Sequence, residues 1–276
     1  MARLAIVIVS FNTRPELEDC LASIAAHPPS TSYEIIVVDN ASADGTPDVL
    51  RIRWPEVRLI AAGRNLGFAG ANNLGIRGAD SEFVLLLNSD TIVRPQSLDR
   101  LLDQLVRDPS VSAAGPRLVD GRGRTELSFG AMIAPLAEVR QKLLVTLHER
   151  GVEPVSWYVR RLTSRPSYPD WISGACLLVR RADALEAGLL DERYFLYAED
   201  VDFCAALRGL GKRLRFSPEA EVVHLRGRSR RQRASATERA YRESQLAFYA
   251  KHHPRWVAVL RLYLKVRGKL PAPRSS

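Results

Sequence analysis

Three apolar runs in the first third of the chain each stop abruptly at polar residues. They span residues 4–9, 33–38 and 85–87. Short apolar runs between polar turn formers are typical of strands that are buried on both faces of a sheet. Residues that favour a helix start follow the runs, such as Pro15 after the first and Pro47 after the second. Repeated strand, loop and helix units predict an α/β fold with a predominantly parallel sheet.

The polar residues that follow these runs are expected at one edge of the sheet. Ligands of α/β sheets bind outside the carboxyl ends of the strands, so Asp39 and Asp90 would face a ligand crevice. In Asn88-Ser89-Asp90 a carboxylate follows directly on a buried strand, which suits a metal ion. The alternative, that Asp90 only caps the next helix, stays open on this motif alone.

A segment rich in Asn and Gly lies between the second and third runs, at residues 64–75. Its glycines permit close approach of the backbone, and its Asn side chains can pair with a base, a ribose or a phosphate. A tight turn into an ordinary helix would have the same composition. The segment alone therefore does not decide between the two.

Taken together, several segments resemble the family 2 glycosyltransferases. The nucleotide-binding half of that family is matched by residues 8–12, 38–46, 65–73 and 88–90. The resemblance continues through residues 171–181, 191–202 and 218–224, and covers about residues 3–230. It implies the GT-A fold, a Rossmann-like, predominantly parallel sheet flanked by helices.

The resemblance also implies a division of the chain. Residues 1–230 would form the glycosyltransferase domain, with a nucleotide-sugar-binding half (1–118) and an acceptor and catalytic half (119–230). Residues 231–276 would form a basic amphipathic helical extension. Residues 120–170 are rich in loop formers, with a helix expected around residues 136–148. This segment would provide a lid or an acceptor platform, and the pattern does not choose between the two.

Within the family the chain looks most like rhamnosyltransferases that extend lipid-linked cell-wall or O-antigen precursors. This implies an inverting, metal-dependent enzyme that moves L-rhamnose from dTDP-rhamnose to a hydroxyl of a glycan or polyprenyl-diphosphate-linked saccharide. A UDP-sugar donor stays open, as does a homo-oligomeric assembly. Two other classes are a sugar nucleotidyltransferase and a non-catalytic sugar- or polyanion-binding protein. Residues 10–13 lack the Gly-rich basic loop that the first needs, and intact Asp90, Asp200 and His224 argue against the second.

A divalent ion would neutralise the leaving nucleoside diphosphate. Mg²⁺ and Mn²⁺ prefer carboxylate ligands, and Mn²⁺ also accepts imidazole. The resemblance places Asp90 and His224 on the metal. The family's fuller pattern has two carboxylates where this chain has Asn88-Ser89-Asp90, so much of the coordination would come from the diphosphate and water.

The acceptor hydroxyl must lose a proton as it attacks, which requires a general base. The resemblance assigns this role to Asp200, with support from Glu199, Asp202, Trp171 and Gly174. Neighbouring carboxylates raise one another's pKa. The alternative is that these residues form only an acidic first turn of a helix running to Leu210.

The donor would contact Ser10, Asn12, Asp39, Asn65, Gly67, Asn72, Asn88 and Ser89.

Positive charge is concentrated at the C-terminal end. Residues 205–276 hold 18 Lys and Arg against 4 Asp and Glu, and five arginines lie within residues 226–233. Aromatic residues are not interleaved with this cluster, which disfavours nucleic acid as a partner. They lie at Trp256 and Tyr263, in a segment where cations recur every four residues beside a wide apolar face. Such a helix suits an anionic membrane surface, although its apolar face would equally suit packing on the domain.

The remaining sequence features concern the compartment. Cys20, Cys176 and Cys204 are odd in number and form no CxxC pair, which suggests neither a disulfide framework nor a zinc site. The first apolar run is short and lacks a cleavage site, so it reads as a strand. No apolar run reaches the length of about 18 residues that spans a membrane. We therefore expect a cytoplasmic protein, peripheral at the inner face of the cell membrane.

Overall fold

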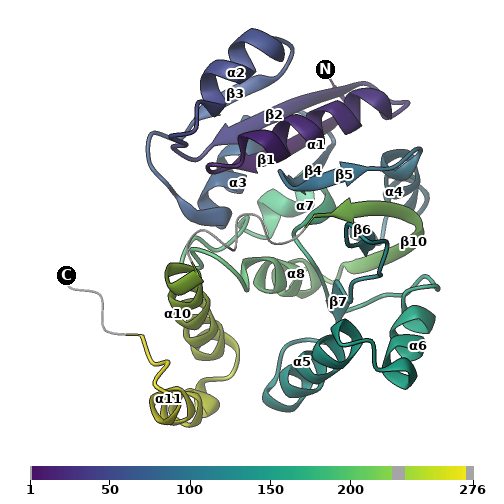
Figure 1. Cartoon of the computed structure of the whole chain (residues 1–276). Coiled ribbons are helices and arrows are strands. Elements are labelled where there is room, and N and C mark those ends of the chain that lie inside the picture. The colour runs from purple at the N-terminus through teal and green to yellow at the C-terminus, as the bar shows by residue number, and fades with distance from the viewer. Residues whose placement is uncertain (1, 226–233, 272–276) are drawn as a thin grey trace.

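The computed structural model describes residues 2–225 and 234–271, with no side chains described for residues 234–237. An eight-stranded sheet forms its centre, in the order β3-β2-β1-β4-β9-β6-β10-β5 (Figure 1). The strands are β1 (Leu4–Ser10), β2 (Tyr33–Asp39), β3 (Arg58–Ala61), β4 (Phe83–Asn88), β5 (Thr91–Val93), β6 (Val111–Val119), β9 (Cys176–Arg180) and β10 (Arg213–His224). The three apolar runs form β1, β2 and part of β4, as predicted.

Most neighbouring strands in the first half of the sheet run parallel. β1 pairs in parallel with β2 and with β4, and β3 extends this set beyond β2. β9 is antiparallel to both β4 and β6, while β10 runs parallel to β6. The carboxyl ends of β1, β2, β4, β6 and β10 therefore meet at one edge. The predicted division at residue 118 falls inside β6, and the two halves stay a prediction.

Helices cover both faces of the sheet because strand side chains alternate between two apolar layers. Leu4, Ile6 and Ile8 of β1 enter one layer, and Ala5 and Val7 enter the other. The first layer is covered by α1 (Arg14–Ala26), α2 (Thr46–Arg53) and α4 (Ser97–Arg107). The second is covered by α3 (Gly67–Gly78), α7 (Arg181–Glu186) and α8 (Glu199–Gly209). The α/β class is confirmed.

The third strand is not followed directly by a helix, which was the expectation. Ser89 and Asp90 form a two-residue turn, and β5 follows at once. Thr91 and its neighbours are β-branched and pair antiparallel with β10, which favours the strand. The hydroxyl of Thr91 also donates to the carbonyl of Asn88 at 2.7 Å. Asp90 therefore does not cap a helix.

The segment whose role the sequence left open forms a small sheet and two helices. β7 (Phe129–Gly130) pairs antiparallel with β8 (Trp171–Ile172), and between them lie α5 (Pro135–Glu149) and α6 (Glu153–Leu162). The helix expected around residues 136–148 is thus confirmed.

The C-terminal part is helical. It consists of α10 (Ala234–His252), the short 3₁₀ helix η1 (Pro254–Trp256) and α11 (Val257–Val266). The arginine cluster at 226–233 lies outside the described residues. Within the described part of the chain, no helix is both long and apolar enough to cross a membrane.

Candidate active site

The predicted site residues gather at the edge where the parallel strands end. Ser10, Asp39 and Asn88 are the last residues of β1, β2 and β4, and His224 is the last residue of β10. Gly174 lies two residues before β9, which enters the sheet at the same edge because it is antiparallel to β4. Residues separated by more than 200 positions are thus brought to one rim.

A chain of hydroxyl groups lines the part of this edge nearest β1. The hydroxyls of Ser10 and Thr13 lie 3.1 Å apart, and that of Thr13 lies 2.9 Å from Ser89. Asn12 has a positive φ of 55°, and its side-chain oxygen accepts from the backbone N–H of Ala43 at 2.7 Å. The β1 loop is therefore tied to both neighbouring strand ends.

The end of β2 is bonded to the loop that precedes α3. Asp39 is buried, and its carboxylate accepts from the backbone N–H of Ser42 at 3.2 Å. Asn65 accepts from the amide of Asn40 and from the backbone of Gly67, both at 2.9 Å. These bonds fix the backbone that would meet a donor.

Gly67 marks a close approach between α3 and a distant loop. Its φ is +74°, and a Cβ there would overlap the carbonyl oxygen of Phe195. The next residue, Phe68, donates its N–H to that same oxygen at 2.8 Å. Asn72, further along the helix, is buried and donates to the carbonyl of Phe68 at 2.9 Å. Its role at the donor stays a prediction.

The proposed metal residues lie side by side. Nε2 of His224 is 3.4 Å from Oδ1 of Asp90, and its Nδ1 is 3.3 Å from Oε2 of Glu126. Burial lowers the pKa of His224, but the hydrogen bonds to Asp90 and Glu126 outweigh it and raise the pKa to about 9. A metal ion at Nε2 would have to displace a proton, because ligating imidazole is neutral.

The side chains of Asp90 and His224 provide ligand atoms that suit a divalent ion. A carboxylate oxygen and an imidazole nitrogen suit Mn²⁺, and neighbouring ligands of an octahedral ion lie about 3 Å apart. The two ring nitrogens of His224 face different carboxylates, so Asp90 and Glu126 do not converge on one point. Accordingly, no cluster of three or more His, Cys, Asp or Glu side chains in the described residues could hold an ion.

Asp200 lies in the first turn of α8, partly buried, and its side chain accepts from two backbone N–H groups. Its Oδ2 accepts from the N–H of Gly174 at 2.9 Å, and its Oδ1 accepts from Val201 at 2.8 Å. Burial raises the pKa of Asp200, while these backbone hydrogen bonds oppose the increase. A Cβ on residue 174 would lie 3.2 Å from that of Asp200, so the glycine permits this contact. Trp171 donates from Nε1 to the carbonyl of Ala131 at 2.9 Å.

The two carboxylates beside Asp200 have different environments. Glu199 is 5% exposed, and its Oε2 has no hydrogen-bond partner among the described residues. Burial and the nearby charge of Asp200 raise the pKa of Glu199 well above its ordinary value, which favours a neutral side chain. Asp202 instead contacts α10, through Lys251 at 2.7 Å and His252 at 2.6 Å.

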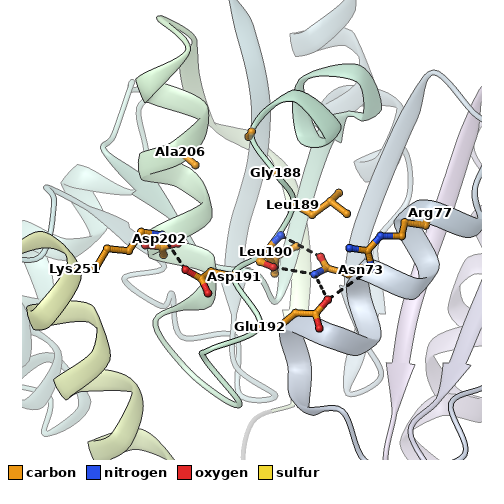
Figure 2. Close-up of a pocket in the computed structure, with 11 residues that line it drawn as sticks. Asn73, Arg77, Gly188, Leu189, Leu190, Asp191, Glu192, Asp202, Ala206 and Lys251 are labelled. Carbon is orange, nitrogen blue, oxygen red and sulfur yellow. Dashed lines mark hydrogen bonds and ion pairs between the residues drawn. The ribbon is translucent and has the colours of Figure 1, made fainter.

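A cavity of about 340 Å³ lies on the side of α8 where Asp202 meets α10. Figure 2 shows Asp202 and Asp191 facing Lys251, and Asn73 of α3 facing Leu190 and Glu192. The Lys251 ammonium bonds both aspartates. We interpret this cavity as part of the contact between α8 and α10. Lys251 is paired with both aspartates, and Asp90 is not among the lining residues.

Sequence reasoning missed several residues that shape the site. Glu126 lies 98 positions from His224 and follows no recognisable motif, so nothing in the pattern indicates it. Lys251 and His252 lie 49 and 50 positions from Asp202, again outside any recognisable motif. Thr13 carried a signal, because it belongs to the polar residues 10–13 that follow the first apolar run.

Comparison with known proteins decides the family. The sequence pattern described as Glycosyl transferase family 2 matches residues 5–165. The chain belongs to this family. A relative from Mycobacterium tuberculosis (strain H37Rv), N-acetylglucosaminyl-diphospho-decaprenol L-rhamnosyltransferase, is 32% identical over 98% of this chain and 95% of its own length. The rhamnosyltransferase WbbL of Escherichia coli (strain K12) is 23% identical over 89% and 92%.

Solved glycosyltransferase structures share the fold of this family 2 member. The mannosyltransferase PcManGT of Pyrobaculum calidifontis, in complex with GDP-Man and Mn²⁺, gives a TM-score of 0.63 at 19% identity. That alignment covers 94% of this chain and 68% of the other. GalNAc-T7 with UDP, GalNAc and Mn²⁺ gives 0.64 at 17% identity, covering 89% and 48%. The GT-A fold and glycosyltransferase class expected from the sequence are confirmed.

Proposed function

We propose that this glycosyltransferase moves L-rhamnose from dTDP-rhamnose to a saccharide hydroxyl on a polyprenyl-diphosphate lipid, with inversion at the anomeric carbon. The observation that carries the proposal is the placement of Asp200 on the same sheet edge as the Asp90–His224 pair. Relatives similar over nearly the whole chain carry rhamnosyltransferase names, and one of these names includes a lipid-linked diphosphate sugar.

Asp200 acts as the general base. The N–H groups of Gly174 and Val201 hold its two oxygens, so the carboxylate keeps one orientation when the acceptor hydroxyl arrives. Burial raises its pKa, which makes it a stronger base than an exposed aspartate. The raised pKa of Glu199 favours its neutral form beside Asp200, which avoids a second negative charge. Direct attack of the hydroxyl inverts the anomeric centre without a covalent enzyme intermediate.

Asp90 and His224 would hold a divalent metal ion, Mn²⁺ or Mg²⁺. When bound, such an ion neutralises the negative charge that develops on the departing nucleoside diphosphate. Glu126 contacts Nδ1 of His224 and so orients the ring with Nε2 toward Asp90. Structures that share the fold contain Mn²⁺ together with a nucleotide or nucleotide sugar, which supports this assignment.

The rim beside β1, β2 and β4 would bind the nucleotide of the donor. Hydroxyl and amide groups suit ribose, base edge and phosphate contacts. Asn88 adds a partly buried amide at the end of β4, two residues before Asp90. The residues assigned to the donor are Ser10, Asn12, Asp39, Asn65, Gly67, Asn72, Asn88 and Ser89.

The enzyme is proposed to act at the inner face of the cell membrane, where a lipid-linked acceptor is presented. α11 carries cations and exposed apolar side chains, which suits an anionic surface. Part of the apolar face packs on the domain, which is the alternative that the sequence left open. Leu260 and Leu264 are buried against Phe248 and Tyr249, so they do not insert.

A donor screen with a short acceptor analogue tests the proposal. The protein is incubated with dTDP-rhamnose or a UDP-sugar, with Mn²⁺ or a chelator, and the glycosidic product is identified by NMR. A product of inverted anomeric configuration, formed from dTDP-rhamnose and lost with the chelator, is expected. In a parallel incubation with a nucleoside triphosphate and a sugar 1-phosphate, release of pyrophosphate with formation of a nucleotide sugar would indicate the nucleotidyltransferase alternative instead.

A further inference from the structure

Helix α5 presents an apolar stripe outward. None of its residues is fully buried, and the exposed fractions of Leu136, Val139 and Leu143 are 85%, 65% and 56%. These positions are three and four residues apart, so the side chains lie on one face of the helix. Three neighbouring large apolar side chains exposed to water indicate a surface that is covered by a partner.

Helix α11 presents a second apolar surface. Its Val259, Leu262, Tyr263 and Val266 are each more than half exposed, whereas Leu260 and Leu264 are buried and Val257 packs against the same cluster. The helix is therefore anchored by one narrow side. Its wider side is exposed to solvent.

Both helices belong to the same end of the molecule. They lie at the lower end in Figure 1, while α2 lies at the top. Glu138 of α5 accepts from Tyr249 at 2.5 Å and from Gln245 at 2.7 Å, both on α10. The ring of His253 lies 2.6 Å from the carbonyl oxygen of Ile133 just before α5. These bonds join α5 to the C-terminal helices as one unit.

The charged side chains beside the two apolar surfaces are mostly positive. α5 exposes Arg140 and Lys142, its Glu138 is turned toward α10 and Lys142, and its other acid, Glu149, lies at its C-terminal end beside exposed Arg150. α11 contains no acidic residue, and exposed cations lie along and beside it at Arg255, Arg261, Lys265, Arg267 and Lys269, of which Lys269 pairs with Glu238 of α10. A second copy of the chain would bring like charges together across a two-fold interface. An anionic lipid surface complements both the charge and the apolar side chains.

We infer that α5 and α11 together form a membrane-binding face that inserts into the anionic lipid–water interface. This deepens the proposed function and rests on it, because it adds a second contact from within the glycosyltransferase domain. A cavity of about 70 Å³ lies between α5, α10 and residues 197–201, with Ile133, Val201 and Phe248 among its lining. Insertion of two helices would orient this region, and Asp200 beside it, toward the lipid surface.

Vesicle cosedimentation tests α5 directly. The full chain is mixed with vesicles of phosphatidylcholine alone or phosphatidylcholine with phosphatidylglycerol, without donor or acceptor. Serine at Leu136, Val139 and Leu143 together should weaken binding to the mixed vesicles by about tenfold, because interfacial binding scales with inserted apolar area. The matched control places serine at three exposed apolar positions on other helices, Ile52, Val106 and Leu185, and should bind like the wild type. Equal binding by both variants would overturn the inference.

A site-specific label adds an independent measurement. The native cysteines are all buried, so Leu143→Cys supplies one accessible thiol for an environment-sensitive dye, and Ile52→Cys supplies the control. A blue-shifted emission with mixed vesicles is expected at position 143 and not at 52. Sedimentation velocity is run on the serine variants. A mass change from dimer to monomer in the α5 variant, with unchanged vesicle binding, would assign the face to a second copy instead.

Failure of this inference and failure of the proposed function are distinguishable. Vesicle binding is measured without any sugar chemistry, so it can succeed even where no transfer occurs. Transfer to a water-soluble acceptor can likewise continue in a protein that ignores vesicles. The α5 serine variant should retain that transfer, because its substituted side chains are exposed.

Discussion

The carboxyl edge of the sheet differs from the end formed by α5 and α11 in how far its side chains are already bonded within the protein. At the sheet edge, Ser10, Thr13 and Ser89 bond one another, and Asn65 fixes two neighbours. At the other end, Leu136 and Val266 face outward without cover. A site with internal hydrogen bonds is already organised before its ligand arrives, whereas the helical end needs a partner to bury its surface.

The largest effect is expected at Asp200. Asp200→Asn keeps the shape but removes the base, so turnover should fall about a hundredfold to ten-thousandfold. Donor affinity, measured by calorimetry, should stay nearly unchanged because the substitution leaves the β1, β2 and β4 rim intact. Asp48→Asn on exposed α2 is the control. Retained turnover in Asp200→Asn would show that the rim carries another base.

Shortening a side chain to alanine should affect stability differently on the two sides of α11. Leu264 is fully buried, so Leu264→Ala should lower the free energy of unfolding by about 2–5 kcal/mol. Val266 is 78% exposed, and Val266→Ala should change the free energy of unfolding by less than about 0.5 kcal/mol. Chemical denaturation measures both. Similar losses would mean that the outer side of α11 is also packed.

At the sheet edge, the metal pair should control donor binding. Asp90→Ala and His224→Ala should each weaken Mn²⁺-dependent binding of a nucleoside diphosphate by at least about tenfold, since each removes a ligand. Binding measured with a chelator provides the baseline and should not change. If both variants bind with wild-type affinity in Mn²⁺, the metal is held elsewhere.

The smallest effect concerns pH. The base must be deprotonated, and burial raises the pKa of Asp200, so activity should be full above that pKa and fall as pH drops through it. The fall should begin at a higher pH than an ordinary aspartate, with a pKa of about 4, would give. The measurement is kcat/KM against pH with a soluble acceptor. A midpoint at or below that ordinary value would contradict the raised pKa.

Local patterns predicted the strands and the rim well, because a buried parallel strand is a continuous apolar run. β1, β2 and β4, together with the residues at their ends, follow from that signal. Asp90 lies in a turn before β5 because pairing with distant β10 decides the conformation there. Glu126 and His252 could not be predicted, since their partners are remote in the chain. The apolar stripe of α5 has the same spacing whether it meets a core or a lipid, so its exposure required the structure.

The contact between Asp202 and the end of α10 limits how this enzyme can be recombined with its relatives. Lys251 and His252 hold a carboxylate two positions after the proposed base, so the C-terminal helices help to set where α8 begins. If the C-terminal helices were exchanged alone, side chains of another protein would lie beside the Asp202 carboxylate. A functional chimera would therefore have to transfer α8 and α10 together, and the two segments should diverge as a linked pair.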